Sequence, residues 1–116
     1  MLSVSFIYLG GYHNRSRRIL LQEIFLHIPK VSYKHFGDID AGGFEIYRDL
    51  CEKTGIPFEM YHMDIEVLKQ YEAFGKPLTV NDRKRLETMK SRVGVEELIE
   101  YMLEHNVKLE QECINF

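Results

Sequence analysis

The stretch VSYKHFGDIDAGGF, residues 31–44, decides the fold class of this chain. Its first part is rich in β-branched and aromatic side chains and ends in glycine, which predicts a strand over residues 31–37. Asp38 and Asp40 follow, and two glycines then lead into an apolar pattern with helical spacing. A strand that runs through a polar turn into a helix is typical of the units that build parallel α/β sheets.

The segments on either side of this stretch repeat the same order. Upstream, residues 3–9 (SVSFIYL) predict a strand that ends at a glycine pair, and Asn14 is placed to cap a helix after it. Downstream, the next helix is expected to end at Gly55, and residues 58–62 predict a third short strand. This order favours an α/β fold with a parallel sheet of about three strands, right-handed crossovers and flanking helices.

The second half of the chain has a different pattern. Three helices are expected there, over residues 65–71, 80–90 and 95–104. Asp64 and Thr79 are placed to cap the first two, and the Leu-Glu-Gln-Glu sequence at 109–112 is expected on a helix surface. No further strand and no long polar linker is indicated. We therefore expect a single domain whose α/β half covers residues 1–63 and whose helical half covers residues 64–116.

The composition limits the class of protein and its environment. Of the 116 residues, 45% are hydrophobic and 28% are charged, without repeats or low-complexity tracts, which indicates a folded globular domain. No apolar run approaches the roughly 20 residues that span a bilayer, so no membrane contact is expected. The two cysteines, Cys51 and Cys113, form no C-x-x-C pattern, which argues against a disulfide or zinc framework and favours a reducing, cytoplasmic location.

The charged residues are unevenly distributed along the chain. The net charge of −3 gives no global argument for nucleic-acid binding. Residues 13–18 (HNRSRR) are nevertheless basic without any acid, residues 83–92 are mostly basic, and acids concentrate between residues 96 and 112. This asymmetry permits one basic face on an acidic protein. For each basic run alone, an ordinary solvated helix face remains the alternative interpretation.

The aspartate pair is the main candidate for a functional site. Ligands of parallel α/β sheets gather at the carboxyl ends of the strands, where Asp38, Asp40 and the glycine loop at residues 10–13 are all expected. If the first two strands are neighbours, both loops face one crevice. Side chains two residues apart on an extended segment point the same way, so both carboxylates can reach one ion. Oxygen ligands favour Mg²⁺, Mn²⁺ or Ca²⁺ over zinc, and Gly42 and Gly43 would let a phosphate approach the helix start.

Other interpretations of these residues stay open. An Asp-x-Asp pair beside glycines is also typical of a turn in which one aspartate caps the following helix. Phosphatases with an aspartate nucleophile carry such a pair too, but they require threonine or serine where this chain has Gly42. The glycine loop lacks the third glycine of a dinucleotide-binding fingerprint. The histidines show no metal-ligand spacing, and His13 is kept as a candidate because it lies in the glycine loop.

Together, YLGGYHNRSRRILL at residues 8–21 and HFGDIDAGGFEI at residues 35–46 carry a resemblance to known families. The chain resembles the Toprim domain of the topoisomerase VI A subunit and its meiotic double-strand-break relatives, in which a glycine-tyrosine loop and an Asp-x-Asp follow successive strands. It more closely resembles the C-terminal domain of the Wadjet anti-plasmid defence nuclease subunit JetD. That family carries Gly-Asp-Ile-Asp-x-x-Gly-Phe, a later Met-Asp, similar to Met63-Asp64, and a closing Leu-Glu-Gln-Glu, so the resemblance covers nearly the whole chain.

The resemblance implies a Toprim-like (Rossmann-like) fold and, in the parent protein, DNA cleavage that depends on Mg²⁺ or Mn²⁺. Asp38 and Asp40 then correspond to the metal-binding, catalytic aspartates, Gly11 and Tyr12 to the glycine-tyrosine loop, and Arg18 to its arginine. Toprim domains also use a glutamate at the end of a preceding strand, which this sequence lacks. The chain is therefore expected to be the C-terminal part of a longer protein and to be incomplete as a catalyst.

The remaining expectations concern partners. Arg18, together with Arg15, Arg17 and His13, is expected to contact the DNA backbone without reading its sequence. The resemblance also implies an SMC-type complex as a partner and a homodimer. Water is the expected nucleophile, because no tyrosine of this chain lies in a motif that would make it the nucleophile. The alternative is a non-catalytic DNA-binding or protein-docking module, which the missing glutamate and the negative net charge favour.

Overall fold

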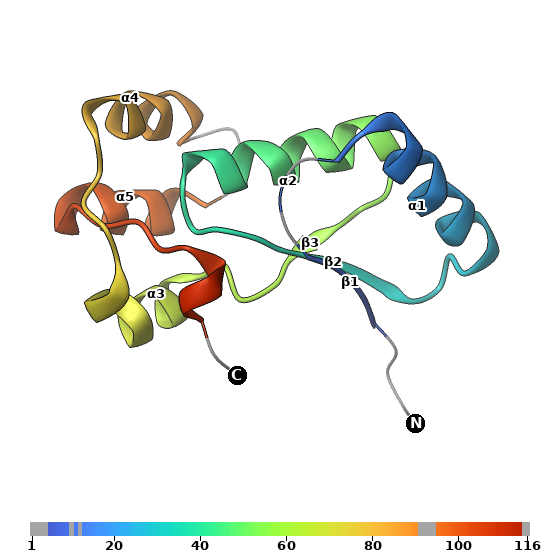
Figure 1. Cartoon of the computed structure of the whole chain (residues 1–116), viewed down its shortest axis with the longest axis horizontal. Helices are drawn as coiled ribbons and strands as arrows, with labels where there is room; N and C mark the ends of the chain where they lie inside the picture. Colours follow the sequence, from blue (N-terminus) through green and yellow to red (C-terminus); the bar gives the residue numbers. More distant parts are fainter. Residues whose placement is uncertain (1–4, 10, 12, 91–94, 115–116) are drawn as a thin grey trace.

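The structure is a computed structural model that describes residues 5–9, 11, 13–90 and 95–114. The α/β half contains β1 (Ser5–Leu9), α1 (Arg15–His27), β2 (Ser32–Phe36), α2 (Ala41–Thr54) and β3 (Glu59–Met60) (Figure 1). The helical half contains α3 (Ile65–Tyr71), the 3₁₀ turn η1 (Glu72–Phe74), α4 (Val80–Met89), α5 (Glu96–His105) and the 3₁₀ turn η2 (Gln111–Cys113). The predicted order of strands and helices is confirmed over these residues, and residues 3 and 4 of the first predicted strand lie outside them.

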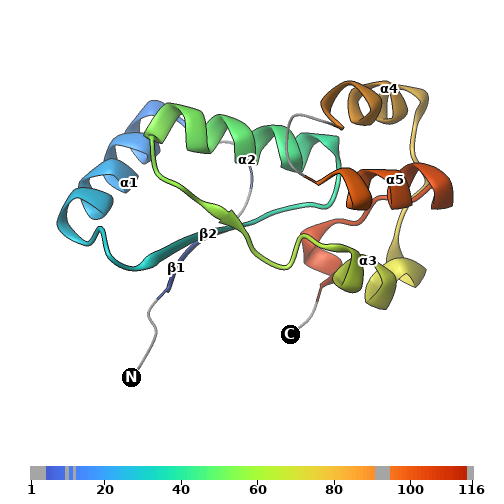
Figure 2. The same ribbon diagram turned by 180° about the vertical axis from the view of Figure 1, so that it is seen from behind.

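The three strands form one parallel sheet in the order β1-β2-β3, as predicted. β1 and β2 pair along their whole length, from Ser5 opposite Ser32 to Leu9 opposite Phe36, whereas β3 pairs through two residues. Helices α1 and α2 lie on the same face of the sheet (Figures 1 and 2), as right-handed crossovers between strands in this order require. The arrangement is that of a Rossmann-like α/β sheet.

Side-chain caps set the starts of three helices at the predicted positions. Asn14, Asp64 and Thr79 each accept a hydrogen bond from a main-chain N–H in the first turn of α1, α3 and α4. Asp82 accepts in turn from the Thr79 N–H, which completes a capping box on α4. At the end of α2, Gly55 adopts a left-handed conformation with φ of 73°, which favours glycine after a helix.

The start of α2 differs from the prediction. The helix begins at Ala41, so Gly42 and Gly43 lie inside its first turn instead of preceding it. Glycine is required at position 43, because a Cβ there would lie 2.0 Å from the carbonyl oxygen of Asp38. The strand-to-helix turn is therefore so tight that the main chains of Asp38 and Gly43 are in contact.

Two apolar clusters hold the described residues together. The larger cluster joins the start of α2 to the helical half and contains Ile39, Ala41, Phe44, Met63, Val67, Leu68, Leu86, Met89, Leu98, Ile99, Met102, Val107, Leu109 and Ile114. The smaller cluster lies between α1, β2 and the second half of α2 and contains Leu21, Tyr33, Leu50, Ile56 and Phe58. The helical half thus packs at the carboxyl end of the sheet (Figure 1). No helix among the described residues is both long and apolar enough to cross a membrane.

The segment after α5 does not form the predicted helix surface. Leu109 pairs with Ile39 in antiparallel fashion, through main-chain hydrogen bonds of 2.8 and 3.1 Å. Lys108 pairs with Lys76 through two further main-chain bonds of 2.9 Å. Residues 107–110 are therefore extended, and the short turn η2 follows them. This placement brings the C-terminal segment against the aspartate pair.

Candidate functional site

The aspartate pair lies at the carboxyl end of β2, as predicted. Ile39 between the two aspartates is fully buried in the larger cluster, whereas Asp38 and Asp40 are half-buried. The alternation of an extended segment thus turns Ile39 into the core and leaves Asp38 and Asp40 partly accessible. Each carboxylate, however, already accepts a main-chain hydrogen bond.

Asp40 is the cap of α2. Its Oδ1 accepts a hydrogen bond of 2.6 Å from the Gly43 N–H, so the capping interpretation of this aspartate is confirmed. Burial raises the pKa of the Asp40 carboxyl above its usual value; the Gly43 N–H opposes this shift, and the charge of Asp38 adds to it. Burial and the nearby charge of Asp38 thus both disfavour the ionised form of Asp40, and a bound cation would favour that form.

Asp38 is held by the C-terminal segment. Its Oδ1 accepts a hydrogen bond of 2.8 Å from the main-chain N–H of Gln111. Together with the pairing of Leu109 and Ile39, this bond fixes the loop after β2 from the opposite end of the chain. The Leu-Glu-Gln-Glu sequence thus contributes to the candidate site through its main chain.

A cavity of about 170 Å³ lies beside Asp38. Its walls are formed by Gly11, Asp38, Gly43, Ile46, Gln111 and Glu112. The loop after β1 and the loop after β2 therefore face one crevice, as predicted from neighbouring parallel strands. The unpredicted part of this crevice is the wall that the C-terminal segment supplies.

The glycine loop places its histidine away from this cavity. His13 is buried. The Arg18 guanidinium donates to the Nδ1 of His13 at 3.2 Å and to the main-chain carbonyl oxygen of His13 at 3.2 Å. The Nε2 of His13 lies 3.7 Å from the Asp49 carboxylate. A second cavity of about 270 Å³ lies there, lined by His13, Gly42, Glu45, Ile46, Arg48 and Asp49. Arg18 therefore fixes the start of α1 to its preceding loop, and Tyr12 lies outside the described residues.

The two basic runs differ in how they are used. Arg15 and Arg17 are exposed in the first turn of α1. In the second run, Arg83 donates to the carbonyl of Leu103, and Arg85 forms an ion pair of 2.6 Å with Glu45. Arg83 and Arg85 thus contribute to internal contacts, and Arg15 and Arg17 are candidates for a basic contact surface by their exposure alone.

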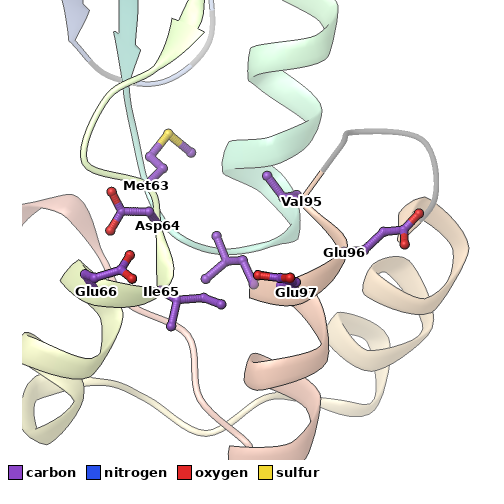
Figure 3. A pocket seen from close by; sticks show the side chains of 8 residues that line it. Met63, Asp64, Ile65, Glu66, Val95, Glu96 and Glu97 are labelled. Carbon is purple, nitrogen blue, oxygen red and sulfur yellow. The ribbon is translucent and has the colours of Figure 1, made fainter.

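A larger cavity lies elsewhere and has a different chemistry. It measures about 580 Å³ and lies between the starts of α3 and α5 (Figure 3). Four acids line it, Asp64, Glu66, Glu96 and Glu97, together with Met63, Ile65, Val95 and Leu98. Figure 3 shows the labelled carboxylates spread across the opening instead of converging on one point. Asp64 is engaged as the cap of α3, so we do not assign a ligand to this cavity.

The donor set at Asp38 and Asp40 suits a hard divalent cation, although it is small. Within the described ranges, no group of three His, Cys, Asp or Glu side chains is placed to hold an ion. Mg²⁺ commonly uses one or two carboxylates and completes its shell with water and substrate phosphate oxygens. The two aspartates therefore fit an ion held mainly by water and phosphate.

The C-terminal wall of the site was missed because the residues were assigned to a helix. Val107 and Leu109 are buried whereas Lys108 and Glu110 are partly exposed. This alternation of apolar and polar residues is typical of an extended segment and could have predicted one. The partner of that segment, Ile39, lies too far away in sequence for any local pattern to identify.

Comparisons with known proteins match nearly the whole chain. A family model described as "Wadjet protein JetD, C-terminal" matches residues 3–116. The Wadjet protein JetD of Bacillus cereus (strain Q1) is 29% identical over 117 residues, which cover 97% of this chain and 29% of that protein. The chain thus spans less than a third of the length of this curated relative.

Proposed function

The chain belongs to the family of the C-terminal region of Wadjet protein JetD, and we propose that it is the metal-binding, Toprim-like part of a protein that cleaves plasmid DNA in cellular defence. The observation that carries this proposal is the crevice at the carboxyl end of the sheet, which Asp38 and Gly11 line together. In parallel α/β sheets such a crevice is the usual place for a ligand.

Asp38 and Asp40 are the proposed ligands of Mg²⁺ or Mn²⁺. A bound divalent ion supplies charge neutralisation at a scissile phosphate and its leaving oxygen. The protein contributes two carboxylates, already fixed by main-chain bonds from Gln111 and Gly43. Such fixed groups need little reorganisation when charge develops, which is how a preorganised site lowers a barrier.

Arg15 and Arg17 are the proposed contacts to the DNA backbone, because they are exposed at the start of α1. Arg18 acts differently in this proposal: its bonds to His13 fix the loop from which α1 starts. Phosphate contacts of this kind give affinity without sequence preference. Membership of the family further suggests an SMC-type complex as partner, a homodimer and a cytoplasmic location.

The test is a charge-removing double variant of the complete gene product, Asp38→Asn with Asp40→Asn. Asparagine keeps an acceptor for the N–H groups of Gln111 and Gly43, so the fold should persist. Plasmid nicking in Mg²⁺ or Mn²⁺ should fall at least about 100-fold, the scale of losing a charge-stabilising group. The matched control, Glu23→Gln with Glu87→Gln, removes the same charge at exposed positions on α1 and α4 and should nick normally. Undiminished nicking by the aspartate variant contradicts the proposal.

A non-catalytic DNA-binding or docking module is the second candidate. It is favoured by the main-chain bonds that both aspartates already make and by the lack of a three-residue metal cluster among residues 5–9, 11, 13–90 and 95–114. The two functions differ in their dependence on metal. Binding of DNA that Mn²⁺ does not change, with no nicking by the complete protein, favours the module.

A further inference from the structure

The C-terminal segment forms hydrogen bonds with two residues of the Asp-Ile-Asp sequence, Asp38 and Ile39. The Gln111 N–H donates to Asp38 at 2.8 Å. Leu109 exchanges two main-chain bonds with Ile39. The loop after β2 is therefore held at Asp38 and Ile39 by a segment about 70 positions away in sequence.

This segment has its own anchors, which do not involve the aspartate pair. Leu109 is buried in the larger apolar cluster. Lys108 forms an ion pair of 2.6 Å with Asp82 and pairs through its main chain with Lys76. Lys76 also forms an ion pair of 2.7 Å with Glu110. The position of the Gln111 N–H is thus set by the core and by α4, independently of the carboxylate that accepts from it.

We propose that the main-chain N–H of Gln111 is a positioning group for the metal-binding carboxylate of Asp38; this inference rests on the function proposed above. A carboxylate has about four acceptor sites, so it can accept the N–H and still bind an ion. The N–H holds the orientation of the Asp38 side chain, which lines the cavity. Groups that orient a metal ligand in this way typically change metal affinity 10- to 100-fold when removed.

A purely structural role for the same bond makes a different prediction. If the bond only starts η2, its loss should lower stability and leave metal affinity unchanged. If it orients Asp38, its loss should lower metal affinity more than stability. The coupling is reciprocal: if the hydrogen bond from Gln111 raises the affinity for the metal by some factor, bound metal raises the equilibrium constant for forming that hydrogen bond by the same factor. The two roles can therefore be separated by experiments on metal binding alone.

Position 111 allows the N–H to be removed with little strain. Proline has no N–H, and it is tolerated at the first position of a helix, which Gln111 occupies in η2. The preceding residue, Glu110, is extended with φ −78° and ψ 140°, as proline requires of its predecessor. Gln111→Pro thus removes the donor to Asp38, and Gln111→Ala is the matched control that changes the side chain and keeps the donor.

The experiment measures Mn²⁺ affinity of the purified protein by electron paramagnetic resonance, with denaturant unfolding of each variant. Gln111→Pro should bind Mn²⁺ about 10- to 100-fold more weakly than Gln111→Ala. Equal or tighter binding by the proline variant overturns the inference. Asp38→Asn is the arm that tests the proposed function itself: if this variant binds Mn²⁺ like the unaltered protein, Asp38 is no ligand and the proposed metal site falls. Failure of the unaltered protein to bind Mn²⁺ overturns both.

A second measurement covers the case in which Gln111→Pro does not fold. Amide hydrogen exchange at Gln111 is followed by NMR in the unaltered protein with and without Mg²⁺. The positioning role predicts that saturating Mg²⁺ slows exchange of this amide, while the amide of Lys108, which donates to Lys76, changes little. Unchanged or faster exchange at Gln111 on adding Mg²⁺ overturns the inference.

Discussion

The two apolar clusters of this molecule differ in how completely they are covered. The larger cluster is enclosed by α2, the helical half and the C-terminal segment, and the exposed large apolar residues described in the helical half are Phe74 and Val80. The smaller cluster lies beneath α1, and the segments that pack on it, β1 and α1 with the residue after it, also carry exposed apolar side chains. They are Ile7, Leu9, Ile19, Leu20, Leu26 and Ile28. Figure 2 shows α1 and the helical half at opposite ends of α2.

The two clusters support different parts of the proposed site. Ile39 and Leu109, which hold the aspartate loop, belong to the well-covered cluster. Arg15 and Arg17 start α1, which rests on the less covered one. Stability varies across a structure with the apolar burial of each region. We therefore expect the metal-binding loop to be the more stable part and the basic helix start to be the less stable part.

The largest effect expected is from removing a leucine of the larger cluster. Leu68 is 0% exposed and enclosed on all sides, so Leu68→Ala should lower the free energy of unfolding by about 4 kcal/mol. Leu21, at 4% exposed, is a leucine of the smaller cluster whose neighbours Ile24 and Phe25 are only partly buried. Those neighbours can move into the space, so Leu21→Ala should cost about 2 kcal/mol.

Chemical denaturation of both variants measures this difference directly. The surface variant Leu20→Ala, on the exposed face of α1, serves as the control and should lie within about 0.5 kcal/mol of the unaltered protein. If Leu21→Ala costs as much as Leu68→Ala, the two clusters are equally well packed and the comparison fails.

The second effect concerns the two glycines at the start of α2. A Cβ at Gly43 would lie 2.0 Å from the Asp38 carbonyl, so Gly43→Ala should force the turn apart and cost about 3 kcal/mol. A Cβ at Gly42 would meet the Asp40 carboxylate at 3.4 Å, an ordinary contact, so Gly42→Ala should change stability by less than about 1 kcal/mol. Thermal unfolding distinguishes them, and similar losses in both would show that the turn is not the close approach described above.

The glycines also show how far the sequence could predict this structure. The local signals were sufficient for the parallel sheet, for the caps at Asn14, Asp64 and Thr79, and for the aspartate pair at the end of β2. They could not show which glycine is needed, because that depends on a main-chain approach to Asp38. The C-terminal wall likewise depends on a pairing between distant residues, which no local periodicity encodes.

The third effect concerns DNA binding at the less covered end. Arg15→Gln with Arg17→Gln should leave stability nearly unchanged, because both residues are exposed. If each contacts one phosphate, the slope of log affinity against log salt concentration should become shallower by about 2. Lys30→Gln with Lys84→Gln, exposed on other parts of the surface, is the charge-matched control. Equal slopes for the two double variants, measured by fluorescence anisotropy, would remove α1 from the DNA contact surface.

The smallest effect expected is the pH response of His13, which joins α1 to α2. Because a guanidinium has no acceptor, the Nδ1 of His13 must accept from Arg18, so the ring is neutral in this arrangement. Burial lowers its pKa; Asp49 on α2 opposes this shift, whereas Arg18 and, on α2, Lys53 add to it. The unfolded chain therefore binds a proton at His13 more readily than the folded protein does.

A lowered folded pKa fixes the sign of the response. The contribution of His13 to stability is fully present above the ordinary histidine pKa of about 6.5 and is lost as the pH falls through the lower folded value. His13→Gln keeps an acceptor for Arg18 without the titration, so its unfolding free energy should change less between pH 7 and pH 5 than that of the unaltered protein.

Because the bond from Arg18 holds the start of α1, protonation of His13 should loosen the less covered end first. Amide exchange should therefore quicken in α1 before it does in α3, and simultaneous loss of protection in both helices would mean that the two clusters unfold as one unit.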